Sequence, residues 1–306
     1  MNKEFEKGLL DITISSSRLT GEIAGYILGS GGKRLRPKLV LMMGEAVGVD
    51  PEKIMPMAYS VEILHTASLL HDDVVDGTEI RRFKPTANQV YGDKPALLAG
   101  DFLSATALDI VFSIGNIRIA QSIVRTIKKM AEGELKEIEY AASFHNNINT
   151  YLDIIYLKTA SLFELCTITP GLIADLDPVR IVALSDFGKS IGMAFQIVDD
   201  VINVYPLKDD DKDACNDIFE RKSTLPLIYL FNERPDIISD LSATEDPVKW
   251  RNIIMPGLGN DILNRCRKTV VEYLDYAISA IKQAGFLTDR ILKLPEIILG
   301  PIETRL

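Results

Sequence analysis

The sequence has few residues suited to soft-metal or redox chemistry. Its 306 residues include three cysteines, three histidines and one tryptophan. Cys166, Cys215 and Cys266 are odd in number and far apart in the chain, so neither a disulfide framework nor a zinc site of paired cysteines is predicted. Such isolated thiols are typical of reduced, intracellular proteins, and we therefore expect a cytoplasmic location.

Long apolar runs and blocks of positive charge are also missing. No segment has 18 uninterrupted apolar residues, and the start MNKEFEKGLLD lacks the apolar core of a signal peptide. We expect no transmembrane segment, which leaves peripheral membrane contact open. The net charge of −9, without any basic run, argues against nucleic acid as a partner.

Helical periodicity dominates the chain, and the two-residue alternation of strands is scarce. Apolar residues recur at helical spacing from Leu9 to Leu28, where GSGG follows, and another helix is expected to begin near Asp50. Further helical runs are predicted near residues 97–114, 119–142, 150–168, 179–204, 224–231 and 260–282. Polar, unperiodic residues 206–221 predict a loop. Without a repeat or a linker, residues 1–306 are predicted to form one all-α domain.

Three aspartates gather at the end of the stretch VEILHTASLLHDDVVDGTEIRR, residues 61–82. In a helix, Asp72 and Asp76 share a face at i,i+4, and Asp73 adjoins Asp76 at i,i+3. Like charges at these spacings repel, so the cluster needs a compensating cation. Carboxylate oxygens suit a hard ion such as Mg²⁺. The alternative is an ordinary solvated acidic end of a helix.

Cationic and imidazole groups accompany these aspartates. His65 lies about two turns before Asp72, Arg81 and Arg82 follow it, and GGKRLRP contributes Lys33 and Arg36. Carboxylates flanked by phosphate-seeking donors are typical of a site for a metal-bound polyanion. Taken singly, each has a structural alternative: a core histidine, loop charges, or arginines that simply neutralise the aspartates.

A second polar constellation occurs in FQIVDDVINVY. Asp199, Asp200 and Asn203 repeat the spacing of the first cluster, with an amide in the third place, and Gln196 lies one turn before Asp200. Two helices of a bundle that present such groups inward form a polar site. Two matched aspartate clusters bridged by Mg²⁺ would clamp a diphosphate better than either alone.

Lysines with less distinctive surroundings complete the candidate groups. Lys158 interrupts the apolar segment LKTASLFEL, where a lysine whose charged end reaches solvent is the common alternative. Lys212, Asp217 and Lys222 add charge to the predicted loop, and loop charges of this kind often have no ligand. Only their combination with the two aspartate clusters favours a shared site.

Together these motifs resemble the trans-polyprenyl diphosphate synthases, with closest similarity to octaprenyl and other long-chain synthases. The likeness runs through GGKRLRP, HTASLLHDDVVD, the paired arginines, LKTASLF, FQIVDD and KSTLPLI, between Gly31 and Leu230. It implies the isoprenoid synthase fold, a single-domain helical bundle around a central apolar cavity. It also implies Mg²⁺ as cofactor, isopentenyl diphosphate and an allylic diphosphate as substrates, and a homodimer.

The resemblance also implies a role at each matching position. Residues expected to hold isopentenyl diphosphate are Lys33, Arg36, His65 and Arg82. Those expected around the allylic diphosphate are Arg81, Lys158, Thr159, Gln196, Lys212 and Lys222. Expected metal ligands are Asp72, Asp73, Asp76, Asp199 and Asp200, with Asp217 as an acidic residue near the metal-bound loop. The groups expected to matter most for catalysis are Asp72, Asp73, Lys158 and Asp199.

Two small residues bear on product length. In the family, the growing chain descends beside the helix that carries the first aspartates, and bulky aromatics shortly before them form a floor. Ala67 and Ser68 occupy these places here, five and four residues before Asp72. We therefore expect an all-trans product longer than geranylgeranyl diphosphate, in the hexaprenyl to octaprenyl range. The alternative is that the small residues merely allow close helix contact.

Four positions depart from the family pattern. Phe83, Cys215 and Arg221 stand where the family has glycine, and Asn203 stands where it has aspartate. Asparagine keeps an oxygen but no charge, which weakens a metal site. The missing glycines restrict the backbone where unusual angles are needed. These changes concern the catalytic rate more than the fold.

Three other functions compete with the synthase. A helical metal phosphohydrolase of the HD type would use His71 and Asp72, but it needs several histidines, and only His65 and His145 remain. A class I terpene cyclase shares the first aspartate motif but needs no cradle for a second diphosphate. A partner subunit of a heteromeric synthase, with weak activity alone, would tolerate the four departures.

Overall fold

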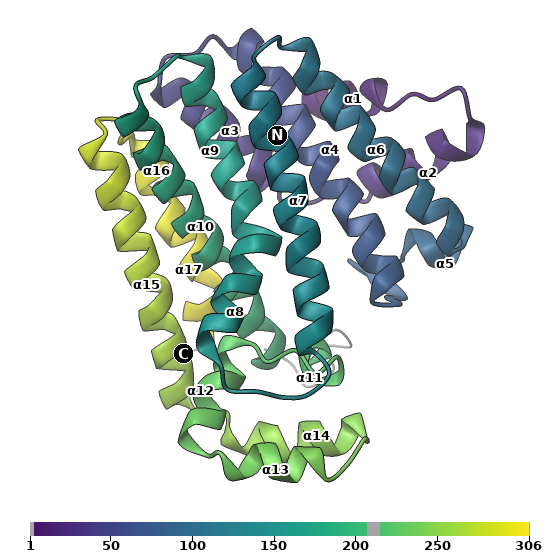
Figure 1. The fold of residues 1–306 in the computed structure, drawn as a ribbon, viewed down its shortest axis with the longest axis vertical. Coiled ribbons are helices and arrows are strands. Elements are labelled where there is room, and N and C mark those ends of the chain that lie inside the picture. Colours follow the sequence, from purple (N-terminus) through teal and green to yellow (C-terminus); the bar gives the residue numbers. More distant parts are fainter. Residues whose placement is uncertain (1–2, 207–214, 306) are drawn as a thin grey trace. The chain divides into compact units, whose positions relative to one another are not determined.

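A computed structural model of the protein describes residues 3–206 and 215–305 (Figure 1). Over these residues the regular structure is helical apart from two strands of two residues each, β1 (Ile80–Arg81) and β2 (Lys84–Pro85). The all-α prediction is confirmed. The chain divides into two compact units, Met1–Val124 with Thr169–Leu176, and Arg125–Ile168 with Asp177–Leu306. A single domain and a central cavity stay predictions, and each unit is described by itself.

The first unit consists of short N-terminal helices and two long ones that lie side by side, α4 and α6 (Figure 1). Its helices are α1 (Lys3–Ile12), α2 (Arg18–Gly29), α3 (Leu35–Ala46), α4 (Pro51–Val75), α5 (Ala87–Tyr91) and α6 (Asp93–Ser113). The single helical run predicted from Leu9 to Leu28 is wrong. The chain leaves the helix after Ile12, and the Ser17 hydroxyl caps α2 by accepting the N–H of Thr20.

Helix α4 brings the first aspartates to its C-terminal end. Asp50 caps its start by accepting the N–H of Glu52, and Pro51 suits the first turn because no helical hydrogen bond is lost there. Gly100 on α6 lets the two helices approach, since a Cβ at this position would lie 2.4 Å from the His71 ring. The aspartates therefore sit at the end of a helix that is anchored along its length.

A buried cation ties the N-terminal elements together. Arg34 is 6% exposed and has a left-handed φ of 49°. Its guanidinium donates to Glu62 at 2.7 Å, to Glu6 at 2.9 and 3.1 Å, and to the Leu28 carbonyl at 2.7 Å. Glu62 is itself buried, so the arginine supplies the charge that keeps this carboxylate in the interior.

The second unit contains the remaining long helices, of which α10 and α15 lie side by side (Figure 1). Its elements are most of α7 (Ile117–Tyr140), α8 (Ile148–Ile155), the π-helix η1 (Tyr156–Ala160), most of α9 (Ser161–Ile173), α10 (Pro178–Val204), α11 (Asn216–Phe219), α12 (Leu225–Glu233), α13 (Asp236–Ser242), α14 (Pro247–Ile254), the 3₁₀ turn η2 (Met255–Gly257), α15 (Asn260–Gln283), α16 (Asp289–Leu292) and α17 (Leu294–Glu303).

Glycines on α10 allow it to approach η1 and α9 very closely. A Cβ at Gly192 would lie 2.5 Å from the Ala160 Cα, and one at Gly188 would lie 2.1 Å from the Thr167 hydroxyl oxygen. Gly188 and Gly192 are four residues apart and continue, at the same spacing, to Gln196 and Asp200. The face of α10 that makes the close contact is therefore the face that carries polar groups one and two turns later.

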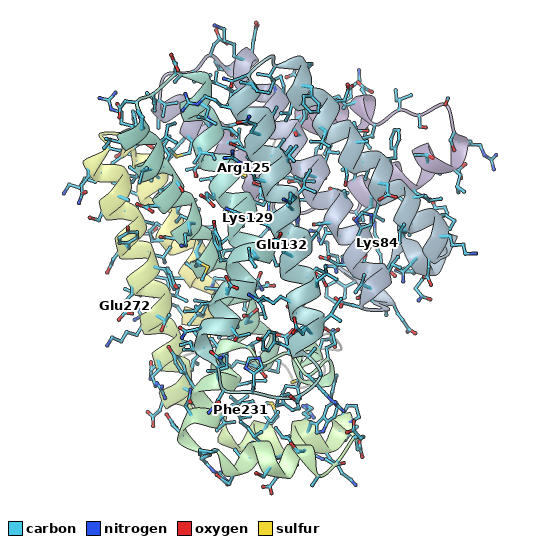
Figure 2. The ribbon with its side chains drawn as sticks, viewed as in Figure 1. Lys84, Arg125, Lys129, Glu132, Phe231 and Glu272 are labelled. Atoms are coloured by element: carbon cyan, nitrogen blue, oxygen red, sulfur yellow. The ribbon has the colours of Figure 1, made fainter. Side chains whose placement is uncertain are left out.

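The π-helix η1 is held against α7 at two points one helical turn apart. Gly133 of α7 faces the Lys158 backbone, where a Cβ would lie 2.6 Å from its nitrogen. Lys129 of α7 (labelled in Figure 2) donates to the Tyr156 hydroxyl at 2.5 Å, and that hydroxyl donates to Glu164 at 2.9 Å. Single π-turns are rare and concentrate at functional sites. This one contains Lys158 and Thr159, two of the residues predicted to bind the allylic diphosphate.

Several short helices escape prediction from periodicity. Helices α5, α13, α14 and α16 have between four and eight residues, too few turns to reveal a repeating apolar face. The predicted loop 206–221 is wrong in part, because its described end contains α11. Helices α6 and α10 are long and apolar enough to cross a membrane by length and composition, a test that core helices also pass. The absence of a transmembrane segment stays a prediction.

Replacing Arg34 by methionine should destabilise the protein by about 3–5 kcal/mol, because it leaves Glu62 buried without its cation. Urea unfolding measured by circular dichroism checks this value. The matched control is Arg18→Met, which removes an exposed i,i+4 pair with Glu22 and should cost less than about 1 kcal/mol. Equal midpoints for the two variants would contradict the role assigned to Arg34.

Candidate active site

A cationic pocket lies inside the first unit. Its lining includes His65 from α4, Arg81 and Arg82 from the hairpin, and Gly31 from the loop before α3. Lys84 (labelled in Figure 2) lines it from β2. The structure thus brings together three of the residues predicted to bind a diphosphate.

A glycine makes room for Arg82 in this pocket. Its guanidinium donates to the Gly31 carbonyl, and a Cβ at Gly32 would lie 2.9 Å from its Nη1. Gly32 also has a φ of +149°, which side chains disfavour. Gly32 therefore allows the Arg82 guanidinium to lie against the backbone and bond to the Gly31 carbonyl, whereas Lys33, the next residue, is exposed.

The cations depress the basicity of the histidine. Burial, and then the charges of Arg36, Arg82, Arg81 and Arg34, hold the pKa of His65 well below its usual value. A neutral His65 offers a hydrogen bond to a bound anion without adding to the repulsion among the arginines. Arg36 is thereby placed in the electrostatic environment of the pocket, as the sequence predicts.

The three aspartates of the first cluster have different surroundings. Asp73 is 1% exposed and accepts hydrogen bonds from Arg81 Nη2 at 2.7 Å and Nε at 2.8 Å. Asp72 and Asp76 are half-buried on one face of the end of α4. Both contacts reach one oxygen of Asp73, Oδ1, so Asp73 fixes the position of Arg81, and Asp72 and Asp76 are the more accessible pair for a cation.

The donor set fits a hard divalent ion of the kind that relies on few protein ligands. No group of three or more His, Cys, Asp or Glu side chains is arranged to hold a metal within residues 3–206 and 215–305. Mg²⁺ usually takes one or two carboxylates and completes its shell with water and substrate phosphates. Asp72 and Asp76 provide that number, and an ion there requires a phosphate ligand as well.

The second unit contains a continuous chain of hydrogen bonds. The Thr159 hydroxyl donates to Gln196 at 2.7 Å, the Gln196 amide donates to Asp200 at 2.8 Å, and the Tyr151 hydroxyl donates to the other oxygen of Asp200 at 2.6 Å. Burial raises the pKa of Asp200 to about 7, and the neighbouring charges of Asp199 and Glu137 add to this effect. A cation would relieve this strain on the carboxylate.

The Lys158 ammonium is held by two carboxylates, so the alternative of a lysine whose charged end lies in solvent is wrong. Its ammonium pairs with Glu134 at 2.7 Å and Glu137 at 2.5 Å, and its side chain is 23% exposed. Lys222 pairs with Glu137 at 3.4 Å and with Glu220 at 2.6 Å. Two predicted phosphate-binding lysines are therefore linked through one half-buried carboxylate, that of Glu137.

Asn203, near the end of α10, accepts hydrogen bonds from two backbone N–H groups at and before α11. Its side-chain oxygen accepts the N–H of Asp217 at 3.2 Å, and its carbonyl accepts the N–H of Cys215 at 2.8 Å. An amide in the place of the family's aspartate thus positions Asp217. Burial, and then the charge of Asp200, raise the pKa of Asp217 well above its usual value. Lys212, also predicted here, lies outside the described residues.

The departures from glycine have a common backbone geometry. Phe83, Cys215 and Arg221 have φ values of 62°, 69° and 56°, in the left-handed region that glycine occupies without strain. The expectation that these positions need unusual angles is confirmed. Each non-glycine residue there costs roughly 1–2 kcal/mol of backbone energy. Phe83 is also 93% exposed, at the turn of the hairpin.

Sequence reasoning missed four residues that support the site. Tyr151, Glu134 and Glu137 lie 7 to 24 positions before Lys158 in the chain and only the fold reveals their partners. Asn88 of α5 donates to the carbonyls of Asp73 and Thr78 at 3.2 and 3.3 Å, and so holds the turn after the first aspartates. Glu134 and Glu137, in EGELKE, share a helical face at i,i+3, the one signal that could have marked them.

The histidines do not assemble the centre of an HD-type phosphohydrolase. The His71 ring contacts α6, with Nε2 3.2 Å from the Leu97 carbonyl and 3.3 Å from Asp101. His145 accepts the N–H of Asn147 through Nδ1, in the second unit. Within residues 3–206 and 215–305, no group of three His, Cys, Asp or Glu side chains is arranged to hold a metal, as such a centre would require.

The all-helical fold is that of the isoprenoid synthases. The chain belongs to one family within that fold, since the family described as Polyprenyl synthetase matches residues 17–249. It is an enzyme of the polyprenyl diphosphate synthase family, a trans-prenyltransferase. The recognition made from the sequence motifs is confirmed, and enzymes of this family use divalent metal ions.

Individual relatives cover nearly the whole chain. It is 31% identical over 283 residues to octaprenyl diphosphate synthase of Escherichia coli, covering 90% of this chain and 87% of that one. It is 32% identical over 261 residues to heptaprenyl diphosphate synthase component 2 of Geobacillus stearothermophilus, covering 84% and 82%. A Caulobacter crescentus polyprenyl synthase, solved with calcium and isoprenyl diphosphate, superposes with a TM-score of 0.85 at 29% identity, covering 99% and 94%.

The raised pKa of Asp200 makes metal-free stability depend on pH. Its folded pKa of about 7 lies above the ordinary value of 3.8, so its favourable contribution is complete below about pH 4 and is lost as pH rises through 7. Asp200→Asn stays neutral, and its unfolding free energy relative to wild type should rise between pH 4 and 8. Urea unfolding across this range in chelator checks it. The control Asp275→Asn, exposed on α15, should give a curve parallel to wild type, and a parallel curve for Asp200→Asn would contradict the prediction.

Proposed function

We propose that the protein is a Mg²⁺-dependent prenyltransferase that condenses isopentenyl diphosphate with an allylic diphosphate. The product is an all-trans polyprenyl diphosphate longer than geranylgeranyl diphosphate. The observation that carries the proposal is the cationic pocket beside α4, whose end bears Asp72 and Asp76. Membership of the polyprenyl synthetase family supports the same chemistry.

Residues of the first unit are assigned to isopentenyl diphosphate. His65 and Arg82 line the pocket, and Arg36 contributes charge to it. Lys33 is exposed and follows Gly31, which also lines the pocket. Charge-assisted hydrogen bonds to phosphate oxygens are strong and directional, and arginine makes them in pairs. A neutral His65 adds a hydrogen bond whose loss would be felt in the affinity for this substrate alone.

A further set of residues is assigned to the allylic diphosphate and its metal. In the first unit, Asp72 and Asp76 would be Mg²⁺ ligands, with Asp73 fixing Arg81. In the second unit, Asp199 and Asp200 would be Mg²⁺ ligands. The other allylic groups are Lys158, Thr159, Gln196, Lys212 and Lys222. The chemistry that the metal supplies when bound is neutralisation of the departing diphosphate.

The reaction requires stabilisation of charge and no nucleophilic side chain. The allylic carbon–oxygen bond breaks, and both of its electrons leave with the diphosphate, whose oxygens Lys158 and Lys222 would contact in place of their glutamates. The double bond of isopentenyl diphosphate, held near by Arg82 and His65, then forms a carbon–carbon bond with the allylic cation. The adduct loses a proton to the departed diphosphate. The side chains must exclude water, which would capture the cation.

A second candidate is a subunit that works with a different partner chain. It is favoured by the relative from Geobacillus stearothermophilus, which is named as component 2 of a synthase, and by the strained departures from glycine. Incubation of the purified chain with labelled isopentenyl diphosphate, Mg²⁺ and each short allylic primer separates the two. Turnover by the chain alone supports the complete enzyme.

We further propose a cytoplasmic homodimer. Helix α6 exposes large apolar side chains, with Leu97 at 42%, Leu98 at 64% and Phe112 at 58% exposure. Apolar residues gathered on one helix favour an interface between chains. The three cysteines are buried and form no disulfide with one another, which agrees with a reducing compartment. Light scattering after gel filtration tests the dimer.

Asp72→Asn and Asp76→Asn should each lower the rate by at least about 100-fold, since they remove metal ligands from the departing group. The melting temperature should stay close to wild type because both side chains are only half-buried. Steady-state turnover and thermal unfolding check the two statements. Asp275→Asn, exposed on α15, is the control, and wild-type rates in either site variant would refute the metal assignment.

Product length is expected to depend on the small residues before Asp72. Ala67 is 0% exposed, whereas Ser68 is half-buried with its hydroxyl bonded to the His65 carbonyl at 2.9 Å. A larger side chain at Ser68 is therefore easier to accommodate and gives the clearer test, whereas the same change at the fully buried Ala67 would cause more strain.

Ser68→Phe should shorten the product by several isoprene units while prenyl transfer continues, because the aromatic ring would rebuild the missing floor. Mass analysis of dephosphorylated products measures the lengths. Ala67→Tyr should shorten them too, with lower stability, and Ser68→Ala is the control. A wild type that stops at fifteen or twenty carbons, or an unchanged distribution in both bulky variants, would show that no open floor exists here.

A further inference from the structure

Arg221 completes the turn that joins two candidate site residues. It follows α11 with a left-handed φ of 56°. Its N–H donates to the Ile218 carbonyl at 3.2 Å, and the N–H of Lys222 donates to the Asp217 carbonyl at 2.7 Å. This is the Schellman pattern, in which glycine is the usual residue at the left-handed position. The turn fixes the spacing between Asp217 and Lys222 through the backbone alone.

The side chain of Arg221 gives the turn an anchor that glycine could not. Nη1 donates to the Ala142 carbonyl at 3.0 Å, and the guanidinium carbon lies 4.3 Å from the centre of the Trp250 ring. Nη2 also pairs with Glu245, which is 83% exposed and so contributes little. Trp250 is 4% exposed and its indole N–H is bonded to the Thr244 carbonyl at 2.9 Å. The Trp250 ring that Arg221 contacts is therefore held in place by burial and by this hydrogen bond.

The anchored turn presents charge where the proposed function needs it. Lys222, the next residue, pairs with Glu137 and Glu220, and Asp217 is bonded to the side chain of Asn203. We propose that Arg221 is a positioning residue, which orders Asp217 and Lys222 before a diphosphate binds. A loop ordered in advance loses less conformational entropy on binding. The identity of the ligand rests on the proposed function.

Two substitutions separate positioning from simple support of the fold. Arg221→Gly keeps the left-handed turn and relieves its backbone strain, while Arg221→Ala keeps a Cβ and removes only the anchor. Both should weaken the binding of inorganic pyrophosphate with Mg²⁺ by about 10-fold, measured by titration calorimetry. Hydrogen exchange of amides 216–222 should become faster in both. A residue needed only for folding would leave the affinity of folded Arg221→Gly unchanged.

Arg265 provides a matched control in the same unit. Its guanidinium lies 4.1 Å from the centre of the Tyr229 ring and pairs with Glu233, so it repeats the ring contact and the ion pair, and both partners lie on α12. Arg265→Ala should bind pyrophosphate within two-fold of wild type. Arg221→Lys keeps the charge but lacks the planar fork, and should show an intermediate loss. It also serves if the smaller variants fold poorly.

The outcomes bear on two different claims. Wild-type affinity in Arg221→Gly, or faster exchange without weaker binding, would overturn the positioning role. Weaker binding in Arg265→Ala to the same extent would overturn it too, because the effect would then follow from any lost arginine. A wild-type protein that neither binds pyrophosphate with Mg²⁺ nor transfers prenyl groups would instead refute the proposed function.

Discussion

The close contact between α10 and the π-helix is the constraint on which the hydrogen-bonded groups around Asp200 depend. Side chains larger than hydrogen at Gly188 and Gly192 would push α10 away from α9 and η1. One and two turns beyond Gly192 on the same face, Gln196 must reach Thr159 and Asp200 must reach Tyr151 at hydrogen-bonding distance. A shift of one ångström would break both contacts, since a hydrogen bond weakens steeply with distance. The hydrogen bonds of Gln196 and Asp200 thus depend on the close packing of α10 at its glycines.

Charge neutralisation inside each unit is the second organising feature. Arg34 is matched by Glu6 and Glu62, Arg81 by Asp73, and Lys158 by Glu134 and Glu137. Removing a single partner from such a group is costly because the remaining charge is poorly hydrated. An anion that binds Lys158 must therefore displace Glu134 and Glu137, so that the lysine exchanges one set of carboxylate partners for the new ligand.

Sequence periodicity was sufficient for helices long enough to show a repeating face and for residues whose partners lie on the same helix. The shared face of Asp72 and Asp76, and the turn from Gln196 to Asp200, are local and were predictable. Tyr151 was not, because its partner Asp200 is 49 residues away and their meeting depends on glycine contacts. Nor could periodicity tell which of Lys33, Arg34 and Arg36 turns inward, since a left-handed φ and two distant glutamates decide it.

The contact of Arg221 with Trp250 gives the protein a spectroscopic handle. Trp250 is the only tryptophan in the sequence, so all indole emission comes from the ring beneath this guanidinium. A nearby cation and a bonded indole N–H both affect the energy of the excited state. Fluorescence of the unlabelled protein therefore reports on one place, the attachment of the turn beside Lys222. Slow changes there during turnover can be followed in real time without introducing a dye.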